Sequence, residues 1–270
     1  MQSAVTISLV KEARGGPFVL WDDLEAGCRT AKKIGFDAVE IFTPAPDAID
    51  PAALRRLLDD QGLRLAAVGT GAGWVKHKLT LALPDADRRR QAAEFIRDII
   101  DFAGPFGAPA IIGSMQGRSG EGVDKPTARG YLSDALEWLG EHARQYGAPL
   151  IYEPLNRYET DQVNRVEDGI ALLQSLSTRN VRLLCDLFHM NIEETDVAEA
   201  LKLAGDLVGH VHFVDSNRRP VGLGHMDFRP IIAALRAIGY SGYLSAEAFP
   251  YPDSLTAAQQ TLRAYRYYVG

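Results

Sequence analysis

Residues 181–187 read Val181-Arg182-Leu183-Leu184-Cys185-Asp186-Leu187, a short aliphatic run that ends in a carboxylate. Longer segments with helical periodicity flank this run, at residues 166–176 before it and residues 197–204 after it. Short aliphatic runs that alternate with helical segments are typical of parallel strands joined by crossover helices. The stretch therefore predicts one strand–helix unit with an acidic side chain at the carboxyl end of its strand.

The same unit recurs along the chain. We predict eight strands, at residues 4–10, 38–43, 64–69, 110–115, 150–155, 181–187, 208–214 and 243–249. Helices are predicted at residues 22–34, 50–61, 86–103, 127–146, 166–176, 197–204, 228–238 and 254–269. Eight units in 270 residues without a linker predict one α/β domain over residues 1–270, a single (β/α)8 TIM barrel.

An open, doubly wound α/β sheet would show the same alternation of strands and helices. Such sheets usually carry a GxGxxG phosphate-binding turn after the first strand. The corresponding stretch here, Gly15-Gly16-Pro17, is too short and is followed by the wrong residues. The sequence therefore favours the closed barrel.

The composition is that of an ordinary globular protein, with 46% hydrophobic and 24% charged residues. A net charge of -6 gives no general attraction to nucleic acid. No segment approaches the roughly 20 apolar residues of a membrane span, and the first ten residues do not resemble a secretory leader. We therefore expect a cytoplasmic protein without a nucleic-acid or membrane partner. Cys28 and Cys185 lack a CxxC spacing and are expected to be buried thiols.

Four polar side chains stand at the carboxyl ends of the fifth to eighth predicted strands: Glu153, Asp186, His212 and Glu247. The active site of a parallel barrel lies at these strand ends, so the four side chains should converge. Crowded carboxylates repel one another unless a cation compensates their charge. We therefore expect one divalent metal ion, with Mn²⁺, Mg²⁺ or Co²⁺ suiting this oxygen-rich set better than structural zinc does. The alternative is four separate caps or salt bridges, which does not explain their common register.

Longer motifs surround these residues. They are EPLNRYE at residues 153–159, DLFHMNIEE at 186–194, HFVDSNR at 212–218 and GLGHMDF at 222–228. With these motifs the chain resembles the xylose isomerase-like sugar isomerases and epimerases, and within them the D-tagatose 3-epimerase-related ketose 3-epimerases. The resemblance spans most of the chain.

The resemblance implies a role for each matching residue. It implies that Glu153, Asp186, His212 and Glu247 bind the metal, and that Glu153 and Glu247 also carry the substrate proton. It further implies that three residues bind the substrate around its first two carbons: Glu159, His189 and Arg218. Homodimers and homotetramers are common in the resembling family, so either state is expected here.

The expected reaction is metal-dependent epimerisation of a ketose at C3, through a cis-enediolate and two glutamates. The alternative is an aldose–ketose type isomerase that acts on hydroxypyruvate, a related 2-oxo sugar acid or a sugar phosphate. A DNA-repair barrel resembling endonuclease IV would need a larger histidine-rich zinc cluster and a basic groove. A non-catalytic sugar-binding barrel would bind metal and sugar without proton exchange.

The loops after the third and fourth predicted strands depart from the resembling family. Gln116 and Arg118 stand where an aromatic residue usually contacts the sugar, so a more polar pocket is expected. Arg118 could bind a phosphate or carboxylate of the substrate, or pair with Glu121. Residues 74–83 are interpreted as a lid over the barrel mouth or as a solvated loop. His210, one pleat deeper than His212, is expected to pack in the core.

Overall fold

The computed structural model describes residues 1–120 and 122–270. Eight parallel strands close into a barrel, in which β1 pairs with both β3 and β9. This closure rules out the open, doubly wound sheet and confirms the predicted single (β/α)8 barrel. The barrel strands are β1 (Gln2–Ser8), β3 (Ala38–Phe42), β4 (Arg64–Gly69), β5 (Ala110–Ile112), β6 (Leu150–Tyr152), β7 (Val181–Asp186), β8 (Val208–His212) and β9 (Tyr243–Ala246). A short extra strand, β2 (Leu20–Trp21), pairs with β1 outside the ring.

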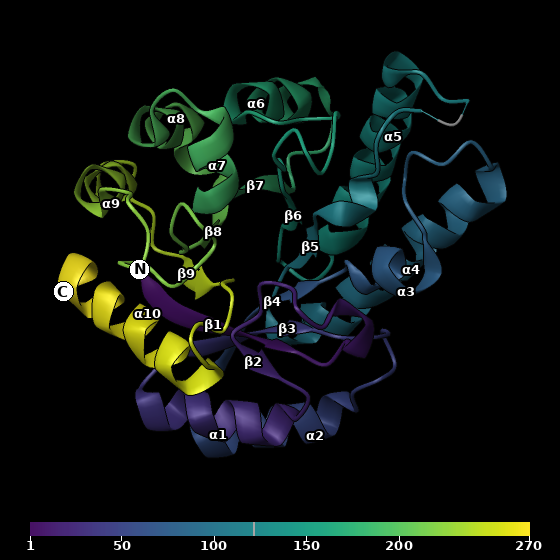
Figure 1. Ribbon diagram of the computed structural model, residues 1–270. Helices are drawn as coiled ribbons and strands as arrows, with labels where there is room; N and C mark the ends of the chain where they lie inside the picture. The colour runs from purple at the N-terminus through teal and green to yellow at the C-terminus, as the bar shows by residue number, and fades with distance from the viewer. Residues whose placement is uncertain (121) are drawn as a thin grey trace.

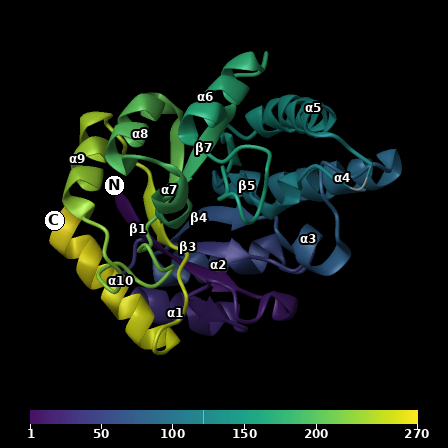
Figure 2. The ribbon, with the colours of Figure 1, turned by 45° about the horizontal axis from the view of Figure 1, so that its top comes forward.

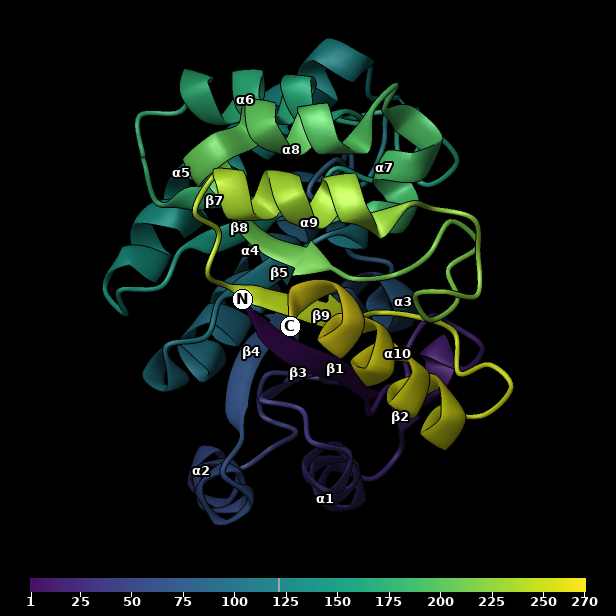
Figure 3. The ribbon, with the colours of Figure 1, turned by 90° about the vertical axis from the view of Figure 1, so that its left-hand side faces the viewer.

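Helices surround the strands (Figure 1), and the tilted view shows them as an outer ring (Figure 2). The outer helices are α1 (Leu24–Ile34), α2 (Pro51–Gln61), α4 (Ala86–Ala103), α5 (Lys125–Arg144), α6 (Val166–Ser175), α8 (Val197–Ala204), α9 (Phe228–Ala237) and α10 (Ser254–Val269). The two ends of the chain lie side by side in all three views, including the side view (Figure 3). A hydrogen bond of 2.7 Å from the Tyr265 hydroxyl to the Met1 carbonyl joins α10 to the N-terminus.

Aspartate caps begin most of these helices, and α2 illustrates the local cause. The carboxylate of Asp50 accepts hydrogen bonds from the backbone nitrogens of Ala52 and Ala53, which would otherwise lack partners. Pro51 has no N–H to satisfy at the first helical position. Gly62 ends the helix with a φ of 59°, which a side chain would disfavour. The predicted helix at residues 50–61 is confirmed.

The barrel interior is filled with side chains beneath the mouth. Ala67, Ile111, Ile151 and Leu184, from four neighbouring strands, form one buried cluster inside the barrel. Because side chains alternate between the two faces of a strand, Ile151 lies one layer below Glu153 and Leu184 one layer below Asp186. Glu153 and Asp186 therefore stand on an apolar layer.

Several predicted strands run too far. The structure ends them at Ile112, Tyr152, His212 and Ala246, because the chain leaves the sheet soon after the barrel mouth. Two short helices at this mouth were not predicted: α3 (Ala72–His77), and α7 (Leu187–Glu193), which begins directly after β7. Four 3-10 turns also occur, η1 (Lys11–Ala13), η2 (Gly104–Phe106), η3 (Ser114–Gln116) and η4 (Gly205–Leu207). In the part of the chain that the structure describes, no helix has the length and apolar character of a membrane span.

Candidate active site

A cavity of about 320 Å³ opens at the carboxyl ends of the strands. Its polar lining residues include Glu153, Glu159, His212, Arg218 and Glu247. Its apolar lining residues include Phe18, Phe42, Trp74, Val75 and Leu155. The cavity therefore combines charged groups with aromatic and aliphatic surface, which suits a small polar ligand with a carbon skeleton.

Glu153, Asp186 and His212 come together as predicted. Each offers one ligand atom, and these atoms lie within 4.8 Å of one another. Nδ1 of His212 is 3.1 Å from Oδ2 of Asp186 and 3.8 Å from Oε1 of Glu153. Asp186 and His212 end their strands, whereas Glu153 directly follows β6. This set of oxygens and one imidazole matches the ligands of a divalent cation.

Glu247 lies beside this group but is already paired. Its Oε2 is 3.6 Å from Nδ1 of His212 and accepts a hydrogen bond of 2.9 Å from the Arg218 guanidinium. Arg218 also lies 3.3 Å from Oε1 of Glu159 and has a left-handed backbone with φ 58°. Glu153, Glu159, His212, Arg218 and Glu247 therefore line the same cavity, and Asp186 lies against His212 beside it.

Asp186 has a second function in the local fold. Its Oδ1 accepts hydrogen bonds from the backbone nitrogens of Phe188 and His189, at 2.7 and 3.2 Å, and so begins helix α7. The cap places the His189 ring next to the other two side chains, with its Nε2 at 3.8 Å from Oε1 of Glu153 and 3.9 Å from Oδ2 of Asp186. The predicted substrate-binding histidine is therefore positioned by the predicted metal ligand.

Burial and mutual charge shift the acid–base behaviour of these groups. Burial, together with the charges of Glu247 and Asp186, raises the pKa of Glu153 well above its ordinary value despite His212. Burial also raises the pKa of Glu247. Burial would by itself lower the pKa of His212, but the carboxylates of Glu247 and Glu40 hold it well above its ordinary value. The raised pKa values of Glu153 and Glu247 show that His212 and Arg218 do not fully offset the burial and mutual repulsion of these carboxylates.

Some polar atoms at the site have no hydrogen-bond partner among the residues that the structure describes. These atoms are Oε1 of Glu153, Nε2 of His189 and Nε of Arg218, all buried. Unpaired buried polar atoms are costly and usually mark the place of a ligand, water or ion. An acceptor and donors left open around a cluster of carboxylates fit a cation and an oxygen-rich substrate.

Sequence reasoning missed Glu40. This residue lies in the middle of β3 and lines the cavity, and its carboxylate contacts both His210 and His212. The imidazoles keep the pKa of Glu40 well below its ordinary value although burial opposes this. His210 is buried in the core as expected, and its ring also pairs with this carboxylate. The signal for Glu40 was a lone charge inside an otherwise apolar strand.

The expectation of a polar sugar contact from Gln116 was also wrong. Gln116 is fully buried, and its Nε2 donates to the carbonyls of Gly113 and Glu153 at 3.0 and 2.9 Å. Its Oε1 accepts a bond of 2.7 Å from the Tyr152 hydroxyl. The η3 turn directs the side chain away from the cavity. Arg118 lines a second cavity, while the expected partner Glu121 lies outside the described residues.

The segment at residues 74–83 is not a solvated loop. Helix α3 occupies its first part, and Leu79, Leu81 and Ala82 are buried. The backbone nitrogen of Leu81 donates a 2.8 Å bond to the carbonyl of Met115. Trp74 remains partly exposed and lines the cavity, so its movement as a lid stays a prediction.

The cysteines are buried as expected, and burial raises the pKa of each thiol to about 12.

Fold and site together define a parallel (β/α)8 barrel with a carboxylate-rich cavity at the carboxyl ends of its strands. The family model of the xylose isomerase-like TIM barrel matches residues 28–268. The chain belongs to this family, as the sequence motifs indicated.

Curated relatives are ketose 3-epimerases, which confirms the expected enzyme class. The chain is similar to L-ribulose 3-epimerase of Mesorhizobium japonicum, with 30% identity over 84% of this chain and 76% of that protein. It is also similar to D-psicose 3-epimerase of Agrobacterium fabrum, with 32% identity over 80% of this chain and 76% of that protein. The solved structure of D-allulose 3-epimerase from Methylomonas sp. superimposes with a TM-score of 0.80 at 26% identity, covering 99% of this chain and 97% of that one.

Proposed function

We propose that the protein is a metal-dependent ketose 3-epimerase. The observation that carries this proposal is the convergence of Glu153, Asp186 and His212 in one cavity, with Glu247 beside them and Oε1 of Glu153 unpaired among the described residues. The activities named for the relatives agree with this arrangement. Binding without catalysis would not require two buried glutamates beside the same imidazole nitrogen, at 3.8 and 3.6 Å from Nδ1 of His212.

Glu153, Asp186, His212 and Glu247 would hold one divalent cation. Hard oxygen ligands with a single imidazole favour Mn²⁺, and Mg²⁺ or Co²⁺ would suit the same set. When bound, such an ion supplies Lewis-acid polarisation of the substrate carbonyl, which acidifies the neighbouring carbon. The ion fits this set of donors because it would supply positive charge that compensates the crowded carboxylates.

Glu153 and Glu247 would move the substrate proton. One carboxylate takes the proton from C3 and leaves a cis-enediolate, and the other returns a proton to the opposite face of the same carbon. In the metal-free protein burial raises the pKa of both groups. Return of the proton to C1 or C2 would instead give aldose–ketose isomerisation.

Three further residues would hold the substrate oxygens. Nε2 of His189 and the guanidinium of Arg218 are donors that suit the charge developing on an enediolate. Glu159, held 3.3 Å from Arg218, would accept a hydrogen bond from a substrate hydroxyl. These groups orient the sugar so that C3 faces the glutamates.

The substrate class follows from the cavity and the relatives. A free ketose such as L-ribulose or D-psicose, which the relatives' names specify, fits a cavity of about 320 Å³. The adjoining cavity of about 390 Å³ shares Trp74, Ser114 and Glu159 with the first and contains Arg118. That guanidinium favours an anionic end group, so a sugar phosphate or 2-oxo sugar acid is the second candidate substrate.

The test is product analysis on metal-stripped protein. The protein is incubated with free ketoses, ketose phosphates and 2-oxo acids, with and without Mn²⁺, and products are identified by NMR. We expect the C3 epimer of a free ketose, formed only when metal is present. An aldose product, or turnover of hydroxypyruvate alone, would instead support the isomerase. Light scattering of the same sample tests the homodimer or homotetramer that we also propose.

A further inference from the structure

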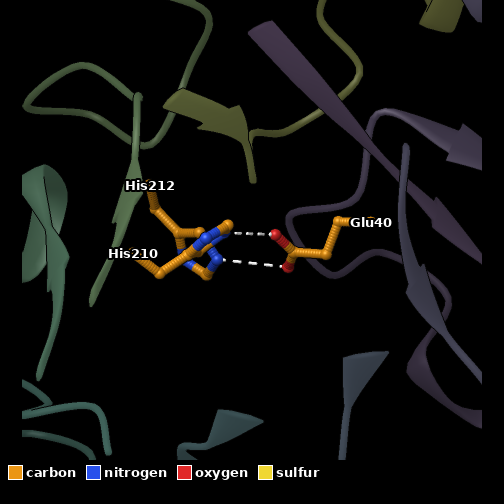
Figure 4. Close-up of side chains that lie close together, drawn as sticks. All are labelled: Glu40, His210 and His212. Atoms are coloured by element: carbon orange, nitrogen blue, oxygen red, sulfur yellow. Dashed lines mark hydrogen bonds and ion pairs between the residues drawn. The ribbon is translucent and has the colours of Figure 1, made fainter. Parts of the chain in front are cut away.

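Glu40 projects into the barrel from the middle of β3 and faces two histidines of β8 across the interior (Figure 4). Its Oε2 is 2.8 Å from Nε2 of His210, and its Oε1 is 3.2 Å from Nε2 of His212. Each carboxylate oxygen thus accepts a hydrogen bond from one imidazole ring. His210 and His212 are two residues apart on one strand and therefore point to the same face.

The two nitrogens of His212 are divided between different partners. Nε2 faces Glu40, whereas Nδ1 faces Asp186, Glu247 and Glu153 at 3.1, 3.6 and 3.8 Å. An ionised carboxylate only accepts hydrogen bonds, so in the metal-free ring Nε2 carries a proton toward Glu40 at 3.2 Å and Nδ1 carries one toward Asp186 at 3.1 Å. A cation bound among the three carboxylates would displace the proton of Nδ1, whereas Glu40 keeps the proton of Nε2. The lone pair of Nδ1 is then the one available to a cation among the three carboxylates.

His210 holds the carboxylate in this orientation. Its bond to Oε2 fixes the rotation of the Glu40 carboxylate, which leaves Oε1 directed at His212. Glu40 and both imidazoles are at most 5% exposed, so water does not compete for these bonds. The ladder register also shifts beside Glu40, between Val39 and Glu40, and such bulges commonly re-aim side chains near active sites.

We propose that Glu40 is a positioning residue, which fixes the tautomer and ring orientation of His212 so that Nδ1 serves as the metal ligand. This inference rests on the proposed metal-dependent function. Although Glu40 lines the cavity, its carboxylate is engaged by His210 and by Nε2 of His212, which is the nitrogen that faces away from the other carboxylates. Carboxylates that hold a metal-binding histidine in this way commonly contribute 10- to 100-fold to metal affinity.

A competing interpretation is a second metal site. One ligand atom each from Glu40, His210 and His212 also lie within 4.8 Å of one another. A cation there would have to displace both hydrogen bonds of Glu40 and would use the opposite nitrogen of His212. The two interpretations therefore differ in the number of ions bound and in which nitrogen is the ligand.

The test is a titration of metal-stripped protein with Mn²⁺ in the absence of substrate. The electron paramagnetic resonance signal of free Mn²⁺ measures how much of the ion is bound. We expect one ion per chain in the wild type, and an affinity roughly 10- to 100-fold weaker in Glu40→Gln. The amide presents an oxygen to one histidine and an NH₂ group to the other, so it cannot accept from both. Glu25→Gln, exposed on α1, is the matched control and should bind like the wild type.

A second readout works on the wild type alone and does not depend on the variant folding. Long-range ¹H–¹⁵N spectra of the Mg²⁺-loaded protein should show His212 protonated at Nε2 and not at Nδ1. Wild-type affinity in a folded Glu40→Gln, ligation through Nε2, or two ions in the wild type and one in the variant would each overturn the inference. A wild type that binds no metal would instead refute the proposed function.

Discussion

The backbone nitrogen of Asn156 lies 3.2 Å from Nδ1 of His189, and the Asn156 side-chain amide reaches the same atom at 2.7 Å. A backbone N–H can only donate, so Nδ1 of His189 is an acceptor and Nε2 carries the proton of the neutral ring. Burial keeps the pKa of His189 below its ordinary value, which favours this neutral form. Nε2–H therefore points toward the cavity as a donor, 3.8 Å from Glu153.

His189→Phe should lower kcat by roughly 10²- to 10³-fold, the usual effect of losing one donor to a developing oxyanion. His189→Gln places an amide donor at a similar distance and should recover part of this loss. Steady-state kinetics measure both variants, and Mn²⁺ affinity should change less than twofold in each. An equal loss of kcat in both variants would show that His189 does not act as a hydrogen-bond donor.

Asp186→Asn separates the two functions of that side chain. Mn²⁺ at 100 times its Kd should stabilise the wild type by about 2.7 kcal/mol. This corresponds to a rise in Tm of roughly 5–10 °C at this chain length. Asparagine keeps the cap on α7 but removes the charge, so the variant should fold and lose most of this rise. Differential scanning fluorimetry with and without EDTA measures it, and an undiminished rise in Asp186→Asn would remove this residue from the ligand set.

The raised pKa of Glu153 has a consequence for the metal-free protein. Because the pKa in the folded state lies above the ordinary value of 4.5, the folded protein binds a proton that the unfolded chain has released. The stability from this group is therefore present below pH 4.5 and is lost as the pH rises through the folded value. Glu153→Gln should have a Tm close to that of the wild type at pH 4.5 and a higher one at pH 7.

Each 1 kcal/mol gained at pH 7 would appear as a rise in Tm of roughly 2–4 °C in a domain of similar size. Thermal melts in EDTA across this pH range provide the measurement. Glu25→Gln, whose carboxylate is 65% exposed, should show no such pH-dependent gain. A gain in Glu153→Gln that is the same at both pH values would contradict the burial of an uncompensated charge.

Gln116→Leu should destabilise the protein by about 1–3 kcal/mol, because it leaves the Tyr152 hydroxyl and the carbonyls of Gly113 and Glu153 without their partner. Urea unfolding measures this change, with Gln174→Leu on the exposed face of α6 as the control. We expect KM to change little. Unchanged stability with a raised KM would mean that Gln116 contacts the sugar after all.

Much of the site could be predicted because the carboxyl ends of parallel strands all lie at the same end of the barrel. Glu153, Asp186 and His212 each follow an apolar run, so their positions along the chain already specified a common height. Glu247 was predicted as an equal member, and it directly follows β9 as Glu153 follows β6, but its carboxylate also accepts a hydrogen bond from Arg218, which was not predicted. A contact of this kind depends on the path of a loop, which periodicity does not describe.

The features that were missed share a different cause. Glu40 lies within a strand instead of at its end, and its partners on β8 are separated from it by most of the chain. Gln116 turns inward because the chain forms a 3-10 turn at residues 114–116, where the sequence pattern predicted a continuing strand. Side-chain direction at such points is decided by tertiary contacts, so short-range patterns carry little information about it.

The measurement that tests the central claim most directly is deuterium incorporation from D₂O. The Mn²⁺-loaded protein is incubated with a free ketose, and the label is located by NMR in the wild type, Glu153→Gln and Glu247→Gln. The account predicts label at C3 in the wild type and at least a 10²-fold slower exchange in each variant, with folding retained. Label at C1 or C2, no label at all, or full activity in either variant would contradict epimerisation by two glutamates.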